Sequence, residues 1–104
     1  MNGAEKILVH VDKDLQDLIP EFLEHRRADV DSIDSAAGAQ DYETVRVLGH
    51  SMKGSGGGYG FDQLTEIGAG LEQAAKAKDG AAIRAGLEKL ADYLARVEVV
   101  YEEL

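Results

Sequence analysis

His50 is the side chain whose position in this sequence most favours chemistry. A neutral imidazole is a nucleophile for phosphorus, and an exposed histidine is mostly neutral near pH 7. With about 100° per residue of helix, Leu48, Met52 and Tyr59 fall within about 20° of the direction opposite His50. These three apolar side chains form the predicted buried stripe. A helix here therefore places His50 in solvent, where a histidine that fills the core would not lie.

Two cations flank His50 on the same predicted helix face. Lys53 and Arg46 lie about 60° and about 40° from it. Lys53 could reach the oxygens of a phosphoryl group on the imidazole and offset their charge, and Arg46 could assist. Nothing in the sequence binds ATP or supplies a catalytic metal. We therefore expect a phosphoryl carrier without a cofactor of its own rather than an enzyme, with Mg²⁺ and the acceptor carboxylate on a partner protein.

Five of the seven residues in the segment Gly54–Gly60 are glycines. One interpretation is a flexible loop, because each glycine within a helix costs about 1 kcal/mol relative to alanine. A phosphate-binding loop is excluded, since no G-x-G-x-x-G register fits and Lys53 precedes the glycines. The third interpretation is a helix with a bare face, where Gly54, Gly57 and Gly58 admit the flat rim of a partner's active site. The position of His50 favours this third interpretation.

The segment of residues 49–61, Gly-His-Ser-Met-Lys-Gly-Ser-Gly-Gly-Gly-Tyr-Gly-Phe, resembles the signature of histidine-containing phosphotransfer (HPt) domains. The positions that fit the family pattern are His50, Met52, Lys53, Gly54, Gly60 and Phe61. The resemblance implies that His50 is the phosphoacceptor and that Lys53 is its electrostatic partner. In some members a glutamine on the next helix accepts a hydrogen bond from the other ring nitrogen. The aligned residue here is Glu72, whose carboxylate could accept that bond although its charge would oppose the phosphoryl group.

The same resemblance implies the partners, which are response-regulator receiver domains, a hybrid histidine kinase, or both. Val47 lies about 60° from His50 and is a candidate for apolar contact with a receiver, although burial against a neighbouring helix is nearly as consistent with the pattern. An alternative function is a docking module of the same fold that transfers nothing. The dimeric phosphoacceptor region of a sensor kinase is disfavoured, because it needs an ATP-binding domain that this sequence lacks.

The elements that must position these residues are predicted to be helices. The expected order is an extended stretch at residues 7–11, a short helical turn at Asp14–Leu18, and helices over Pro20–Ala37, from Asp41 through the glycine run, from Asp62 to Lys78, and from Ile83 to Leu104. Short connections favour antiparallel neighbours. We expect an all-α fold: an antiparallel up-and-down four-helix bundle with a short extra N-terminal helix, forming one domain over residues 1–104 and acting as a monomer.

Composition limits the function classes. The chain has 104 residues, a formal net charge of −9 and no cysteine. The negative charge argues against binding nucleic acid or an anionic membrane, and the missing cysteine excludes disulfides and cysteine-ligated zinc. No apolar run reaches the roughly 18 to 20 residues that span a bilayer, and the first residues do not resemble a signal peptide. We expect a cytoplasmic protein.

Metal binding is a weaker interpretation of the other histidines and of the acidic N-terminal segment. His10 and His25 have no ligand spacing with His50, and His25 lies in a charged helical stretch. The acidic group at Asp12, Asp14 and Asp17 lacks the pattern of an EF-hand loop. No metal site is predicted.

Overall fold

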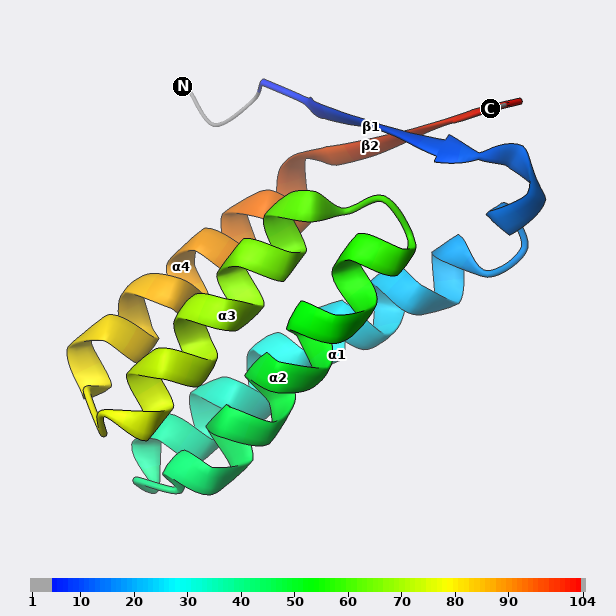
Figure 1. Ribbon diagram of the computed structural model, residues 1–104. Coiled ribbons are helices and arrows are strands. Elements are labelled where there is room, and N and C mark those ends of the chain that lie inside the picture. The colour runs from blue at the N-terminus through cyan, green and yellow to red at the C-terminus, as the bar shows by residue number, and fades with distance from the viewer. Residues whose placement is uncertain (1–4, 104) are drawn as a thin grey trace.

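The computed structural model describes residues 5–103, which form four helices and a two-stranded ribbon across one end of them (Figure 1). The elements in chain order are β1 (Ile7–Asp12), the 3-10 turn η1 (Lys13–Leu15), α1 (Ile19–Gly38), α2 (Tyr42–Gly58), α3 (Asp62–Lys76), α4 (Gly80–Arg96) and β2 (Val97–Glu102). The predicted helical fold is confirmed. Within this described part of the chain, no helix has the length and apolar character to cross a membrane.

Local sequence signals account for most helix ends. Pro20 lies in the first turn of α1, where its missing N–H leaves no hydrogen bond unmade. The side chains of Asp41 and Asp79 cap α2 and α4 by accepting hydrogen bonds from backbone N–H groups two or three residues inside each helix. By contrast, α3 begins at Asp62, directly after Phe61, and has no side-chain cap.

The four helices enclose one core. α1 and α3 each contact both α2 and α4, so every helix packs against two others. The largest fully buried side chains are Phe61, Ile19, Ile33, Met52, Leu64, Leu71, Ile83, Leu90, Val11 and Val45. Met52 is inaccessible, and Leu48 and Tyr59 are partly buried against this core. The predicted buried stripe of α2 is therefore confirmed.

Near both ends of the described chain, the structure differs from the sequence-based prediction. β1 pairs with β2 as a parallel ribbon, with Ile7 opposite Val97 and Asp12 opposite Glu102. The short helical turn predicted at Asp14–Leu18 is present in part as the 3-10 turn η1, but it does not extend into the short extra N-terminal helix that was expected. The extended stretch before it is confirmed. The last helix ends at Arg96 instead of running on to Leu104, which itself lies outside the described residues.

The physical reason lies in the composition of both end segments. Residues 97–102, Val-Glu-Val-Val-Tyr-Glu, are rich in β-branched and aromatic side chains, which favour strands. Residues 7–12 supply a second segment of the same kind, so the backbone groups of both can pair. The spacing of apolar residues in residues 97–102 is also compatible with a helix. Pairing with residues 7–12 decides in favour of a strand.

The glycine-rich segment is helical to Gly58, so the loop interpretation is wrong. Gly49 and Gly56 face α3 at very short range: a Cβ on them would lie 2.8 Å from the backbone N of Glu72 and 2.9 Å from that of Thr65. On α3, a Cβ on Gly68 would lie 2.6 Å from the backbone N of Lys53. These three glycines let the two helices approach closely, and this packing offsets the poor helix propensity of the segment.

Candidate functional site

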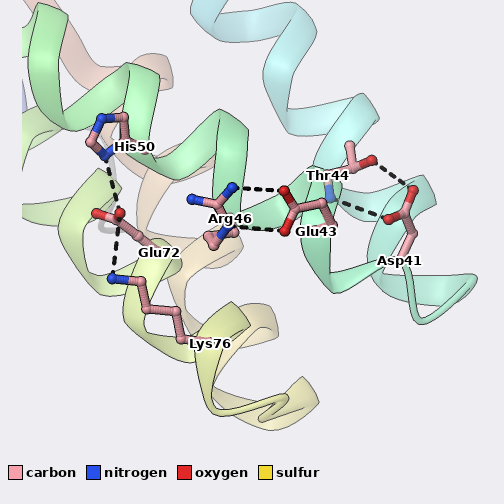
Figure 2. Close-up of polar contacts among 7 residues, drawn as sticks. All are labelled: Asp41, Glu43, Thr44, Arg46, His50, Glu72 and Lys76. Atoms are coloured by element: carbon pink, nitrogen blue, oxygen red, sulfur yellow. Dashed lines mark hydrogen bonds and ion pairs between the residues drawn. The ribbon is translucent and has the colours of Figure 1, made fainter.

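The candidate site lies where α2 and α3 pack together. His50 projects from the middle of α2, and its side chain is 64% exposed. Glu72 projects from α3 and is only 6% exposed. Nδ1 of His50 lies 3.1 Å from Oε2 of Glu72, a contact that joins the two helices (Figure 2). One edge of the imidazole is therefore held against the protein while the ring as a whole remains open to solvent.

The carboxylate of Glu72 is shared among three nitrogens. Oε1 accepts from Nζ of Lys53 at 2.9 Å, and Oε2 faces both His50 and Nζ of Lys76, the latter at 3.7 Å. The hydrogen bond from Lys53 is the main cause that lowers the pKa of Glu72 to about 2. Burial opposes this, and the His50 bond and the charges of both lysines add to the lowering. Glu72 is ionised throughout the neutral range.

The charge of Glu72 determines the tautomer of His50. An ionised carboxylate can only accept hydrogen bonds, so a neutral imidazole must carry its proton on Nδ1 to make the 3.1 Å contact. Nε2 then has the free lone pair. Because the ring is exposed, this nitrogen is the nucleophile that the site offers to an incoming group.

Lys53 pairs with the same carboxylate that contacts His50. Its side chain is 41% exposed, and its ammonium group lies 2.9 Å from Oε1 of Glu72, whereas the imidazole contacts Oε2. Its backbone oxygen accepts a hydrogen bond from the Thr65 hydroxyl of α3 at 3.2 Å. The structure thus brings together three of the predicted site residues: His50, Lys53 and Glu72.

The guanidinium of Arg46 pairs with a carboxylate on its own helix. Its guanidinium donates to both carboxylate oxygens of Glu43, at 3.0 and 2.7 Å, on its own helix (Figure 2). The carboxylate of Glu43 was not among the predicted site residues, although a glutamate three residues before an arginine on a helix is a signal for such a pair. Arg46 is therefore oriented by Glu43, and it makes no contact with His50 among the hydrogen bonds of residues 5–103.

The remaining predicted residues form an exposed surface beside His50. Val47 is 48% exposed, so the interpretation that it is buried against a neighbouring helix is wrong. Gly54 and Gly58 face open space, and a Cβ on Gly57 would meet only the Thr65 hydroxyl, at 3.4 Å. We call Val47, Gly54, Gly57 and Gly58 the docking face. It presents little side-chain bulk next to the imidazole.

Sequence reasoning missed Lys76 and the packing role of Gly49 and Gly68. Lys76 lies four residues after Glu72, a spacing that places both on one helix face, and this signal could have identified it. Gly49 and Gly68 allow the close approach that brings Glu72 to His50. Their role depends on the crossing of two helices, which no local pattern reveals.

The other histidines have separate partners. His10 pairs with Glu102 across the ribbon at 3.2 Å, and His25 lies 3.9 Å from Glu21 on α1. In residues 5–103, no group of three or more histidine and acidic side chains is arranged to hold a metal ion.

Comparison with known proteins identified one matching family model. The family model described as "Hpt domain" matches residues 17–99, a span that contains all four helices and the site at His50. Searches of curated proteins and of solved structures gave no match.

Proposed function

We propose that this chain, which belongs to the Hpt domain family, carries a phosphoryl group on Nε2 of His50 in two-component signalling. Membership in the family implies histidine phosphotransfer in a phosphorelay. The observation that supports this assignment to a single atom is the 3.1 Å contact between Nδ1 and the ionised Glu72, which leaves Nε2 free.

The transfer step follows from this tautomer. The Nε2 lone pair attacks the phosphorus of an aspartyl phosphate on a receiver domain, a P–N bond forms, and the P–O bond breaks. The aspartyl oxygen leaves with the electron pair as a carboxylate, and the Nδ1 proton stays in its hydrogen bond to Glu72. The ring then carries a formal positive charge, which the Glu72 carboxylate stabilises. Reversal of these events onto a second receiver completes the relay.

Lys53 is proposed to offset the charge of the phosphoryl group. Its side chain is partly exposed, and its ammonium group pairs with the carboxylate that also contacts the imidazole. A lysine side chain is flexible, so Nζ can exchange one carboxylate oxygen for a phosphoryl oxygen with little movement of its backbone. The magnesium ion that such a transfer needs is assigned to the receiver domain.

The docking face, together with Arg46, is proposed to contact the receiver domain or the hybrid kinase. The absence of side chains at Gly54 and Gly58 allows a partner to approach the imidazole closely. Val47 supplies an exposed apolar contact, of the kind found at the centre of protein interfaces.

We also propose that residues 1–104 act as one monomeric domain whose helices alternate in direction. The connections between α1 and α2, α2 and α3, and α3 and α4 are each three residues long. Such short connections return each helix along the one before it, which supports an up-and-down antiparallel bundle.

The experiment is transfer of labelled phosphoryl from a phosphorylated receiver domain to the wild type, to His50→Gln, and to the control His25→Gln. Label on the wild type and the control but not on His50→Gln is expected. If a receiver binds the intact wild type but never labels it, the alternative of a docking module that transfers nothing replaces the carrier.

A further inference from the structure

The Glu72 carboxylate has a second cation besides Lys53. Nζ of Lys76 lies 3.7 Å from Oε2, the same oxygen that faces Nδ1 of His50 (Figure 2). The carboxylate is 6% exposed, whereas Lys76 is 51% exposed on the last turn of α3. A surface lysine thus reaches the carboxylate oxygen that also contacts the imidazole.

This contact matters because the Glu72 carboxylate touches the imidazole that is proposed to carry an anionic phosphoryl group. Before phosphorylation, Lys53 and Lys76 together offset the single negative charge of Glu72. Once Lys53 turns to the phosphoryl oxygens, Glu72 and the phosphoryl group repel each other at short range unless another cation stays on the carboxylate. Lys76 contacts Oε2, the oxygen on the imidazole side, so its ammonium group can remain on the carboxylate after Lys53 has left.

We propose that Lys76 is a positioning residue for phosphotransfer, which keeps the Glu72 carboxylate neutralised and so releases Lys53 to the phosphoryl group on His50. This inference rests on the proposed function. Lys76 touches neither the imidazole nor the phosphoryl group, and it acts only through Glu72.

A purely structural role for Lys76 makes a different prediction. A glutamate followed by a lysine four residues later stabilises a helix by a few tenths of a kcal/mol, and a lysine in the last turn favours the helix dipole. Removal of such a pair lowers stability slightly but leaves the chemistry of His50 unchanged. The two roles are separated by a reaction rate measured in the presence and absence of the Glu72 charge.

The experiment uses phosphoramidate, a small donor that needs no partner protein. Nε2 attacks its phosphorus, the P–N bond of the donor breaks, and ammonia leaves. Labelling is followed by ³¹P NMR for the wild type, Lys76→Met and Lys76→Arg, and for Lys76→Met combined with Glu72→Gln. Lys89→Met, on the exposed side of α4, is the control with the same change in net charge.

Lys76→Met is expected to slow labelling by about three- to tenfold, the effect of one partly screened charge at this range. Lys76→Arg should restore the rate, and Lys89→Met should match the wild type. In the Glu72→Gln background, Lys76→Met should change the rate by less than about twofold, because no carboxylate remains to neutralise. An equal loss in both backgrounds, or no loss in either, overturns the role of Lys76. Failure of the wild type to be labelled at His50 instead overturns the proposed function.

Discussion

Nδ1 of His50 and Oε2 of Glu72 lie 3.1 Å apart, and this contact is the basis for proposing the other ring nitrogen as the phosphoryl acceptor. The contact joins α2 to α3 and depends on three glycines that allow the helices to approach closely. Because Glu72 is buried and ionised, the hydrogen bond has one possible direction. The chemistry of an exposed histidine is therefore set by a carboxylate that is itself inaccessible.

Substitution of Glu72 tests this relationship. Glu72→Leu removes the acceptor, frees the ring to rotate and change tautomer, and should lower the rate of phosphotransfer by roughly 10- to 100-fold. Glu72→Gln keeps an acceptor oxygen and should stay within about threefold of the wild type. The tautomer is read by ¹⁵N NMR of the imidazole, which should show a proton on Nδ1 in the wild type. A proton on Nε2, or equal rates for all three proteins, would contradict the assignment.

The pH dependence of stability gives a second test. The pKa of Glu72 is lowered from 4.5 to about 2 in the folded protein, so its ionisation stabilises the fold above pH 4.5. That contribution is lost as the pH falls from about 4.5 towards about 2. The difference in free energy of unfolding between the wild type and Glu72→Gln should therefore shrink over this range. Urea titrations at several pH values measure it, and a constant difference would show that the pKa is not lowered.

Lys53→Met should weaken the same pH dependence. The hydrogen bond from Lys53 is the largest cause of the lowered pKa of Glu72. Without it, the pKa of Glu72 should lie closer to 4.5, so the stability that its ionisation contributes should be smaller and should be lost over a narrower pH range below 4.5. If the free energy of unfolding of Lys53→Met falls below pH 4.5 by the same amount as that of the wild type, Lys53 and Glu72 are not paired in solution.

An alanine in place of Gly54 tests whether the missing side chain in the docking face matters for transfer. Gly54 faces open space within a helix, so Gly54→Ala should stabilise the fold by about 0.5–1 kcal/mol. The added methyl group should nevertheless slow transfer from a receiver while leaving labelling by phosphoramidate unchanged. Gly70→Ala, at an equally open position on α3, is the control and should stabilise without slowing transfer. Unchanged transfer in Gly54→Ala would remove this glycine from the docking face.

Gly56→Ala should have the opposite effect on stability, two residues further along the same helix. Its Cβ would lie 2.9 Å from both the backbone N and the hydroxyl of Thr65, so α2 and α3 must separate. We expect a loss of about 1–3 kcal/mol, the usual cost of an overpacked contact. Thermal unfolding compares it with Gly54→Ala, and equal stability of the two variants would show that the helices do not approach so closely.

Much of the site could be predicted from sequence because it depends on local periodicity. The helical angle between His50 and the stripe that contains Met52 predicts exposure of the one and burial of the other, and both are observed. The match of residues 49–61 to a family signature pointed to Lys53, and the family's glutamine position on the next helix pointed to Glu72. The carboxylate of Glu72 contacts both Lys53 and His50.

The parts that could not be predicted depend on contacts between distant segments. The ribbon forms because residues 7–12 and 97–102 meet at one end of the bundle, where a strand pair replaces the predicted end of the last helix (Figure 1). Similarly, Gly49 and Gly68 matter only because two helices cross at these positions.

The most direct test of the central claim is the position of the phosphoryl group itself. After phosphorylation by a receiver domain, a ¹H–¹⁵N spectrum of the histidine rings with ³¹P coupling identifies both the residue and the nitrogen that is modified. We predict phosphorus bound to Nε2 of His50, with the Nδ1 proton retained and hydrogen-bonded to Glu72. Phosphorus on Nδ1 of His50, or on His10 or His25, would contradict the account.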